Sequence, residues 1–383
     1  MHICFLCSEY PGLRQTYGGV GTFTRTLARA LVARGHQVTV VGAYERSGTS
    51  EDCGVRLVQV RVPRMHGVGA LLSMLAMRRA LSELYAHAPF DVLDGPELSL
   101  AGVPKSVSAV CVIRMNGGHH FFYTAEGRKP RFGRALVERM SFARADALAA
   151  VSRYVAEVTR HLLRLGPRPI EILPNPVNTA LFHPRDGVSP VPGRVMFVGT
   201  LCEKKGIRQL VQAMPLVARR VPNAHLVAIG RDWRDPKTGQ SYLERLTQEE
   251  DASALDLVSF RGPVPNDTLP GELATASVCV YPSHMEALPV AWVEGMACGK
   301  AVVASQTGPG PEVIENGVSG LLCNPHDPND IAEKVVQVLC DRDLAERLGK
   351  AARERAEAVF SVDVLVRKNE AFYERCVEQK QRK

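Results

Sequence analysis

Two glutamates flank the predicted start of a helix at 290–298. Glu286 lies in the loop before this helix, and Glu294 lies just inside it. The amides of Val290 and Ala291 would form the free N-terminus of the helix, where unpaired N–H groups and the helix dipole favour a diphosphate. Carboxylates cannot hold that anion themselves, but they accept hydrogen bonds from sugar hydroxyls. The spacing therefore indicates a nucleotide-sugar site, with one glutamate for each sugar.

A glycine-rich loop at 18–21 lies between a predicted strand at 2–7 and a predicted helix at 20–34. Glycines at a helix start allow backbone N–H groups to approach an anion. The glycine spacing differs from the G-x-G-x-x-G of dinucleotide-binding proteins, and the second predicted strand, 37–41, ends without an acidic residue. The loop thus predicts anion binding, with a simple turn as the alternative, and it disfavours a dinucleotide.

Short apolar or β-branched runs alternate with helical patterns in both halves of the chain. Uniformly apolar strands separated by helices indicate parallel sheets that are covered on both faces. A proline-rich passage contains the predicted linker. Two doubly wound sheets would form a cleft at the carboxyl ends of their strands, where such sheets bind ligands. The predicted strands lie at 2–7, 37–41, 55–60, 90–94, 107–113, 146–151 and 170–173, and again at 194–199, 224–230, 256–260, 277–281, 301–304 and 319–322.

The composition sets limits on the class of protein. The chain has 383 residues, of which 45% are hydrophobic and 23% charged, so wholesale disorder is excluded and two to three domains are expected. The longest nearly uncharged apolar stretch, 67–77, is too short to span a bilayer, and the start lacks a signal-peptide pattern. We therefore expect a cytoplasmic protein. The ten cysteines show no zinc-site spacing, which predicts buried, reduced thiols.

The formal net charge is +7, and part of the excess is concentrated at 121–145, where six basic residues face two acidic ones. A basic patch suits phosphate-bearing substrates or an anionic lipid surface, and a solvated helix face is an equal alternative. Nucleic acid is disfavoured because zinc-finger spacing and an aromatic RNA-binding motif are missing from the sequence. The basic residues are Arg128, Lys129, Arg131, Arg134, Arg139 and Arg144.

Several short motifs together resemble glycosyltransferase family 4, the retaining enzymes of GT-B fold. The two glutamates are followed by Gly-Met-Ala-Cys-Gly at 295–299, and the resemblance covers essentially the whole chain. It implies a retaining glycosyltransferase that moves a hexosyl group from a UDP- or GDP-sugar to a glycan or lipid-linked acceptor in polysaccharide or glycoconjugate biosynthesis. It also implies that no metal or other cofactor is needed. The further motifs lie at 18–21, 146–152, 174–178, 198–199, 205–206, 261–262, 311–312 and 320–322.

The resemblance also implies a domain organisation. Residues 1–180 would form a Rossmann-like domain on the acceptor side, and 194–360 would form the Rossmann-like domain that binds the nucleotide-sugar, with 181–193 as the linker. The last segment, 361–383, would be a helix that crosses back to the first domain. We expect a peripheral contact with the anionic inner face of the membrane.

The resemblance assigns roles residue by residue. Glu294 would bind the ribose hydroxyls, and Glu286 the hydroxyls of the donor sugar. Lys205 would neutralise the leaving diphosphate, and Gly19 would offer its backbone to the phosphate or the acceptor. The backbone around Arg261 would flank the base. The predicted donor site is completed by Leu288, Val290 and Ala291.

Three positions depart from the family pattern. Pro289 stands where a glycine is common, which removes one possible N–H from the loop. Thr200 stands where many relatives carry an arginine for the diphosphate, so Lys204 or Arg208 would have to substitute. Many relatives also carry a histidine after the fifth strand of the first domain. Here Asn116 stands at the matching position and His119 follows it closely, and both stay candidates for catalytic contacts.

Other functions fit parts of the pattern. One alternative is a nucleotide-sugar epimerase of GT-B fold, which would turn over its donor without an acceptor. Another is a nucleotide-sugar-binding protein without catalysis, which Thr200 and Asn116 would favour. A glycosidase that uses the two glutamates ranks lower, because it explains neither the repeated sheet pattern nor the phosphate-ready helix start. Base, sugar, linkage, acceptor and oligomeric state do not follow from the sequence.

Overall fold

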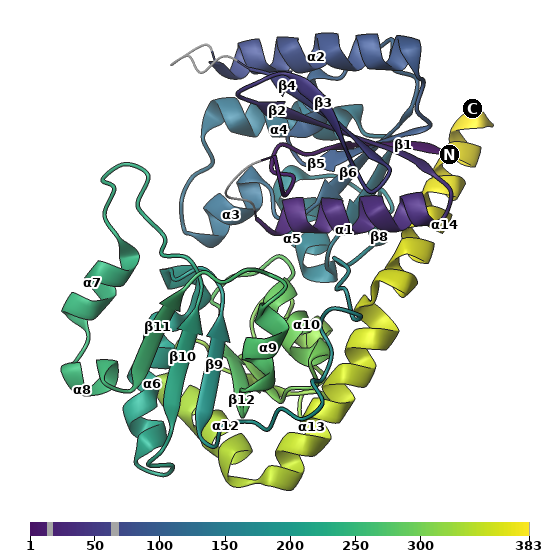
Figure 1. Cartoon of the computed structure of the whole chain (residues 1–383). Helices are drawn as coiled ribbons and strands as arrows, with labels where there is room; N and C mark the ends of the chain where they lie inside the picture. Colours follow the sequence, from purple (N-terminus) through teal and green to yellow (C-terminus); the bar gives the residue numbers. More distant parts are fainter. Residues whose placement is uncertain (14–17, 63–68, 383) are drawn as a thin grey trace. The chain divides into compact units, whose positions relative to one another are not determined.

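The computed structural model of the chain contains two compact units, drawn in Figure 1. The first unit comprises Met1–Pro176 and Val362–Lys383, and the second comprises Val177–Ser361. The residues at 181–193, which we predicted as a linker, belong to the second unit. The structure describes residues 1–13, 18–62 and 69–382.

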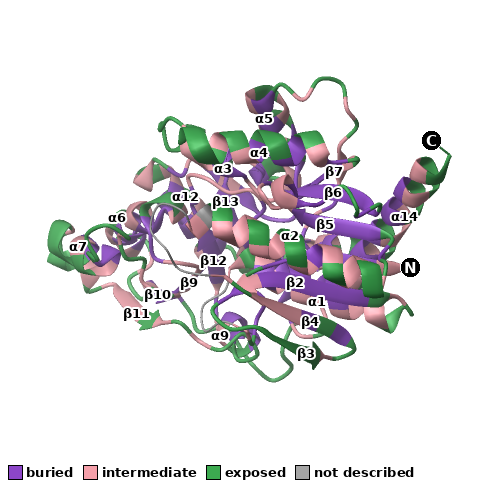
Figure 2. Ribbon diagram, turned by 90° about the horizontal axis from the view of Figure 1, so that it is seen from above, coloured by how far each residue is buried: buried purple, intermediate pink, exposed green. Residues whose placement is uncertain are grey.

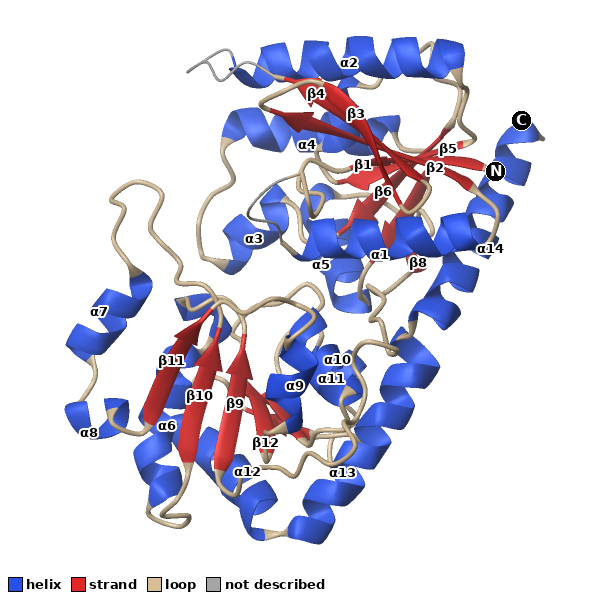
Figure 3. Cartoon of the chain, in the orientation of Figure 1, coloured by secondary structure: helices blue, strands red, loops and turns tan. Residues whose placement is uncertain are grey.

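The first unit is built on an eight-stranded sheet in the order β3-β4-β2-β1-β5-β6-β7-β8 (Figure 3). Neighbouring strands pair in parallel except β3 and β4, which are antiparallel. The apolar runs predicted the parallel strands but missed β3, because its residues are mostly exposed. The strands are β1 (His2–Leu6), β2 (Gln37–Tyr44), β3 (Gly48–Asp52), β4 (Val55–Arg61), β5 (Val92–Pro96), β6 (Val110–Met115), β7 (Ala147–Ala150) and β8 (Glu171–Ile172).

Helices cover this sheet because each buries an apolar stripe. In α1, Phe23, Leu27 and Leu31 lie on one side of the helix and are buried in the core of the unit. The C-terminal α14 is tied to the sheet by Tyr373, whose hydroxyl accepts a hydrogen bond from the buried Arg114 at 3.0 Å. The helices are α1 (Gly19–Ala33), α2 (Gly69–His87), η1 (Ser99–Gly102), α3 (His119–Ala125), α4 (Phe132–Arg144), α5 (Arg153–Leu163) and α14 (Val362–Gln381).

The second unit has a six-stranded sheet in the order β11-β10-β9-β12-β13-β14, and all its neighbours pair in parallel. The carboxyl ends of all six strands therefore meet at one edge. The strands are β9 (Arg194–Val198), β10 (His225–Ile229), β11 (Val258–Gly262), β12 (Val278–Tyr281), β13 (Val302–Ser305) and β14 (Leu321–Cys323).

The helices of the second unit differ in their bounds from those that the sequence pattern predicted. The tail that we expected to be helical over 341–378 is divided into α13, η3 and α14. The helices are η2 (Glu203–Lys205), α6 (Ile207–Ala218), α7 (Tyr242–Glu249), α8 (Ala252–Leu255), α9 (Leu269–Ala274), α10 (Val290–Ala297), α11 (Gly310–Val313), α12 (Pro328–Cys340), α13 (Arg342–Arg355) and η3 (Ala356–Phe360).

Two further predictions can be compared with the structure. Among the described residues, no helix combines the length and apolar character that crossing a bilayer requires. All ten cysteines are free thiols, but Cys53 and Cys340 are exposed. The prediction of buried thiols is therefore wrong at these two positions, of which Cys53 lies in the turn between β3 and β4.

Candidate active site

The carboxyl edge of the second sheet brings two of the predicted residues into direct contact. Lys205, at the end of η2, donates from Nζ to Oε1 of Glu286 at 2.5 Å. The Lys205 side chain is 25% exposed and the Glu286 side chain 11% exposed, so the pair is accessible to a ligand but partly desolvated. A lysine and a glutamate in this position offer one charge to a diphosphate and one acceptor to a hydroxyl.

A glycine allows these two loops to approach. Gly206 adopts φ of +69°, and a Cβ at this position would lie 1.8 Å from the carbonyl oxygen of Pro282. The loops are also joined by the amide of His284, which donates to the carbonyl of Lys204 at 2.9 Å. Only glycine fits this crossing, so Gly206 fixes the position of Lys205 beside Glu286.

Glu294 lies on α10, which directly follows the Glu286 loop. Its side chain is half-buried, and desolvation raises the pKa of the carboxyl to about 7. Pro289 precedes the helix without a side-chain cap, and Val290 and Ala291 are the first residues of α10. Trp292 is buried and stacks on Tyr281 with ring centroids 6.2 Å apart, so this side chain belongs to the core and does not form a sugar platform. Leu288, another predicted donor residue, is buried just before the helix.

Thr200 follows β9 and contacts a cation that the sequence analysis missed. Arg231 follows β10, and its Nε donates to Oγ1 of Thr200 at 3.5 Å. The two strand ends approach each other closely. A Cβ at Gly230 would lie only 1.8 Å from the carbonyl oxygen of Gly199, so a glycine is needed there. Arg231 is exposed, and in the described parts of the chain it pairs with no carboxylate. Its position directly after an apolar strand and a glycine was the available sequence signal.

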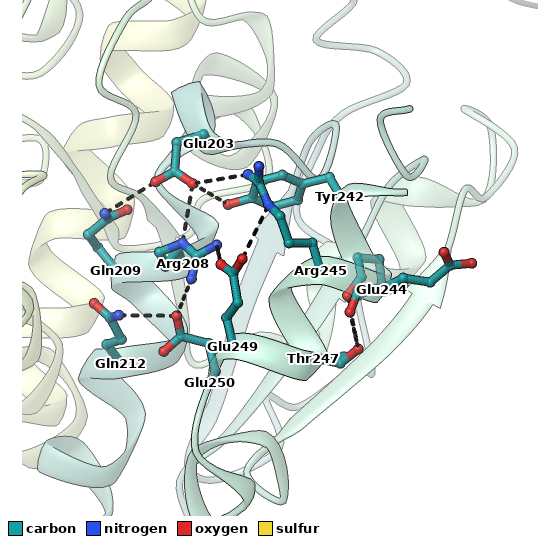
Figure 4. Close-up of polar contacts among 11 residues, drawn as sticks. Glu203, Arg208, Gln209, Gln212, Tyr242, Glu244, Arg245, Thr247, Glu249 and Glu250 are labelled. Atoms are coloured by element: carbon teal, nitrogen blue, oxygen red, sulfur yellow. Dashed lines mark hydrogen bonds and ion pairs between the residues drawn. The ribbon is translucent and has the colours of Figure 1, made fainter. Parts of the chain in front are cut away.

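Arg208, the other candidate for the missing arginine, is held by three carboxylates. Its guanidinium donates to Glu203, Glu249 and Glu250 at 3.2, 2.7 and 2.5 Å (Figure 4). The hydroxyl of Tyr242 donates to the same Glu203 at 3.0 Å. Figure 4 shows these side chains pointing toward one another. Arg208 therefore ties α6 to α7, and the hypothesis that it serves the diphosphate stays a prediction.

Arg261 lies near the end of β11, at the same edge of the sheet. Its side chain is half exposed and pairs with Glu272 at 3.4 Å. Gly262 follows with φ of +69°, and nothing lies within 4 Å of the position of its missing Cβ. The open space at Gly262 leaves the backbone accessible, which is the feature that the predicted base contact requires.

In the first unit, His119 is held by its neighbours at the start of α3. Its Nε2 accepts a hydrogen bond from the amide of Arg131 at 2.9 Å, and its ring lies 4.2 Å from that of Tyr123. Desolvation lowers the pKa of His119. The neutral ring therefore carries its proton on Nδ1.

Asn116 is anchored beside a buried carboxyl. Its amide N–H donates to Oε1 of Glu97 at 2.7 Å, and its Nδ2 donates to the carbonyl of Arg114 at 3.1 Å. Burial raises the pKa of Glu97 to about 8. The Oδ1 atom of Asn116 has no partner among the described residues, which leaves one acceptor at this position.

Glu138 was counted as part of the basic surface segment, but it is buried. Its carboxylate accepts hydrogen bonds from the amides of His119 and His120 at 2.8 and 3.0 Å and also pairs with the ring of His120. No local sequence pattern predicts this arrangement, because it depends on α4 packing beside α3. The amides that begin α3 are thus occupied by the protein's own carboxylate.

The glycine loop at the start of α1 has one open and one occupied position. Gly19 is the first residue of α1, and a Cβ there would meet nothing within 4 Å. However, the amide of Gly21 donates to Oε1 of Glu9 at 3.1 Å, and a Cβ at Gly21 would lie 2.0 Å from the carbonyl oxygen of Glu9. Glu9 therefore occupies the amide of Gly21, and the predicted role of the Gly19 backbone stays a prediction.

Glu9 also borders a cavity of about 890 Å³ within the first unit. Its lining is mainly apolar, with a few polar groups that include Ser8, Ser99 and Arg134. This combination is typical of a site for a small or amphipathic molecule. The apolar lining comes chiefly from Val20, Leu71, Met74, Met77, Leu81, Leu98 and Val137.

Two family models match consecutive parts of the chain. Glycosyltransferase Family 4 matches residues 17–181, and Glycosyl transferases group 1 matches residues 186–355. The chain belongs to this family of glycosyltransferases. Its fold is GT-B, as the resemblance implied, and the prediction that it is an enzyme is confirmed.

Relatives of known name extend over nearly the whole chain. The chain is 28% identical to the GDP-mannose-dependent alpha-(1-6)-phosphatidylinositol monomannoside mannosyltransferase of Mycobacterium tuberculosis, with 96% of each chain covered. It is also 28% identical to the alpha-maltose-1-phosphate synthase of Mycolicibacterium smegmatis, with 94% of this chain and 96% of the relative covered.

Solved structures share the fold of this glycosyltransferase. Sucrose-phosphate synthase from Thermosynechococcus elongatus superposes with a TM-score of 0.81 at 21% identity, covering 98% of both chains. Anabaena HepE in complex with UDP-glucose superposes with a TM-score of 0.74 at 18% identity, covering 98% of this chain and 99% of HepE.

Proposed function

We propose that this glycosyltransferase moves a hexosyl group, with retention of configuration, from a UDP- or GDP-sugar to a glycan or lipid-linked acceptor. The contact between Lys205 and Glu286 carries the proposal. It places a cation and a hydroxyl acceptor together at the carboxyl edge of a parallel sheet, just before α10 and Glu294. Polysaccharide or glycoconjugate biosynthesis is the process that such a transfer serves.

Each donor group has a proposed partner in the second unit. Glu294 accepts hydrogen bonds from the ribose hydroxyls, and Glu286 accepts from a hydroxyl of the transferred sugar. Lys205 and the amides of Val290 and Ala291 hold the diphosphate at the start of α10. When a diphosphate enters, Lys205 is shared between it and Glu286, so negative charge on the leaving group is stabilised where it develops.

Arg231 is the residue that we propose for the role of the missing arginine. Its guanidinium is exposed beside Thr200 at the sheet edge, while Arg208 is committed to three glutamates. A guanidinium can hold two phosphate oxygens at once, which a lysine ammonium does less specifically. The diphosphate would therefore meet Lys205 and Arg231.

The proposed reaction needs no protein base. The bond between the anomeric carbon and the diphosphate oxygen breaks, and the acceptor oxygen attacks the same face of the sugar. The acceptor proton passes to the departing phosphate oxygen, so charge and atoms balance. We further propose that Lys205, Arg231 and the helix start supply the electrostatic stabilisation that a metal ion provides in other enzymes.

The names of relatives support the donor class. One relative is GDP-mannose-dependent, and a protein of the same fold has been solved with UDP-glucose. Both donors are nucleotide-diphosphate sugars. We propose a cytoplasmic location with peripheral contact to an anionic membrane, where such donors and lipid-linked acceptors meet.

A donor screen tests this proposal. UDP- and GDP-sugars are titrated by calorimetry with and without a chelator, and products are analysed by NMR with and without acceptors. We expect binding that survives chelation and a product whose anomeric configuration matches the donor. Turnover of the intact donor to its epimer without acceptor would instead identify an epimerase, and binding without any turnover would identify a non-catalytic protein. If every nucleotide-sugar fails to bind the folded protein, the proposal is wrong.

A further inference from the structure

Tyr242, the first residue of α7, joins the two segments that carry the proposed diphosphate cations. Its backbone amide donates to the carbonyl oxygen of Trp233 at 2.9 Å, and Trp233 lies shortly after Arg231 in the chain. Its hydroxyl donates to Oε2 of Glu203 at 3.0 Å, and Glu203 begins the turn η2 that ends at Lys205. One residue therefore binds both the segment of Arg231 and the segment of Lys205.

The segment of Arg231 is an extension of the second sheet. The amide of Leu201 donates to the carbonyl oxygen of Arg231 at 2.9 Å, and the amide of Trp233 donates to the carbonyl oxygen of Leu201 at 3.1 Å. These bonds continue the parallel pairing of β9 with β10 beyond the ends of both strands. The backbone on both sides of Arg231 is thus held by the sheet, and Tyr242 is attached to this part of the fold.

η2 depends more on contacts from outside. It is a single turn without a side-chain cap, and none of its residues is buried. Such a short 3-10 turn has poor hydrogen-bond geometry and is marginal by itself. The amide of His284 holds the carbonyl of Lys204 at 2.9 Å, and Tyr242 holds the side chain of Glu203. The position of Lys205 therefore follows from these two contacts.

Among the described partners of Glu203, Tyr242 makes the shortest hydrogen bond. The guanidinium of Arg208 is 3.2 Å from the Glu203 carboxylate but closer to two other carboxylates, at 2.7 and 2.5 Å (Figure 4). Gln209 donates to the other oxygen of Glu203 at 3.5 Å. The loss of the Tyr242 hydroxyl would thus remove the main hold on the start of η2.

The hydroxyl of Tyr242 has a fixed position because its ring belongs to the core. Figure 2 shows that most of α7 is exposed, and the buried residues of this helix are Tyr242 and Leu246. Both belong to the hydrophobic core of the second unit. Burial, together with the charge of Glu203, raises the pKa of the Tyr242 hydroxyl, which therefore stays a neutral donor.

Glu203 supplies the ionised partner. Burial works against the charged form, but hydrogen bonds from Tyr242 and Arg208 outweigh it and lower the pKa of the carboxyl. A hydroxyl that donates to a carboxylate makes a charge-assisted hydrogen bond, which is stronger than one between neutral groups. This contact is therefore strong enough to fix a short turn.

We propose that Tyr242 is a positioning residue for the diphosphate: through Glu203 its hydroxyl holds η2 so that Lys205 and Arg231 meet the same diphosphate. The inference rests on the proposed function, in which these two cations bind the leaving group. Tyr242 acts through Glu203 and needs no contact with the donor. Cations that are in place before the bond breaks stabilise the leaving group without reorganisation during the reaction.

The competing explanation is that Tyr242 only anchors α7 in the core. Tyr373 of α14 provides the matched control, because it is also buried and its hydroxyl also donates to a carboxylate, Asp94, at 2.7 Å. Tyr373→Phe removes an equivalent hydrogen bond in the first unit and leaves η2 unchanged. Tyr242→Phe and Tyr373→Phe thus differ in the place of the lost contact and not in its chemistry.

Amide hydrogen exchange in the free protein tests the hold on η2. The amides of Lys205 and Gly206 donate within this turn, to Cys202 and Glu203. In Tyr242→Phe and in Glu203→Ala they should exchange about tenfold faster than in wild type, the effect of one hydrogen bond to a charged group. Tyr373→Phe should leave their exchange unchanged. Exchange at the wild-type rate in both η2 variants would overturn the inference.

NMR titrations with UDP and GDP, and with uridine and guanosine, test the role toward the diphosphate. For the nucleotide that wild type binds, Tyr242→Phe should weaken the affinity about fivefold to tenfold and leave the affinity for its nucleoside unchanged. In the Lys205→Met background, Tyr242→Phe should have no further effect, because the cation that it positions is gone.

The outcomes separate positioning from anchoring. Equal losses for nucleotide and nucleoside, or the same loss in the Lys205→Met background, would make Tyr242 a structural anchor and overturn the inference. A loss of the same size in Tyr373→Phe would also overturn it. If wild type binds neither UDP nor GDP, the proposed function fails and the diphosphate role fails with it. The amide exchange would still decide whether Tyr242 positions η2, because it needs no nucleotide.

Discussion

Glu294 gives the proposed donor site a predictable pH dependence. In the free protein, burial raises the pKa of this carboxyl to about 7. Ribose hydroxyls donate to the ionised carboxylate, so a bound donor stabilises the charged form and lowers the pKa in the complex. Donor binding therefore releases a proton below about pH 7, and donor affinity rises with pH.

The size of the effect follows from that pKa. With a value of about 7, about one-tenth of Glu294 is ionised at about pH 6 and about nine-tenths at about pH 8. Donor affinity should therefore be about tenfold weaker at the lower pH, which corresponds to about 1.4 kcal/mol. In Glu294→Gln the affinity at about pH 8 should fall by about 1.5–3 kcal/mol, the contribution of a hydrogen bond to a charged group.

Calorimetry across this range measures both quantities. Titrations in buffers of different ionisation enthalpy also count the protons released on binding. His284 is a histidine of the same loop, and desolvation lowers its pKa below the ordinary histidine value. A His284→Asn variant should therefore keep the pH dependence of wild type. A flat profile in wild type, or the same slope in Glu294→Gln, would refute the reasoning.

Five further substitutions probe separate parts of the structure. Arg231→Gln should weaken donor binding about tenfold in calorimetry, because a charged contact to the diphosphate is lost. Arg208→Gln should instead lower the unfolding free energy measured in urea by about 3 kcal/mol, because the buried carboxylate of Glu250 then lacks its cation. If Arg208→Gln weakened donor binding and Arg231→Gln lowered stability, the two roles would be exchanged. Gly206→Ala should weaken donor binding and lower the unfolding free energy by at least about 1–3 kcal/mol. Gly262→Ala has the same φ of +69° but open space around it, so its unfolding free energy should fall only by the backbone strain. Glu138→Ala should destabilise the chain by about 3–5 kcal/mol in urea unfolding, because two amides and a ring lose their buried acceptor; a change below about 1 kcal/mol would mean that water replaces it.

The fold was largely predictable because its parallel strands are apolar on both faces. Such strands appear in the sequence as short uniform runs, and thirteen of the fourteen strands of the described chain lie in or overlap the predicted ones. The closeness of Lys205 and Glu286 could also be predicted from the sequence, since both loops follow strands whose carboxyl ends meet at one edge of the sheet. β3 was missed because its exposed, polar residues lack that signal.

Other parts of the candidate site depend on which strands and helices become neighbours. Arg231 lies beside Thr200 only because β10 pairs with β9. Glu9 accepts a hydrogen bond from the amide of Gly21, and Glu138 contacts α3 from a different helix. Sequence spacing cannot show such contacts, because the residues involved are brought together by packing and not by a repeating pattern.

The central claim is that the carboxyl edge of the second sheet holds an activated sugar. The most direct measurement is a crystal structure of the enzyme with an intact UDP- or GDP-sugar. We predict a diphosphate at the start of α10 within hydrogen-bond distance of Lys205, ribose hydroxyls on Glu294, and the sugar beside Glu286. Well-defined nucleotide density away from these three side chains would contradict the account.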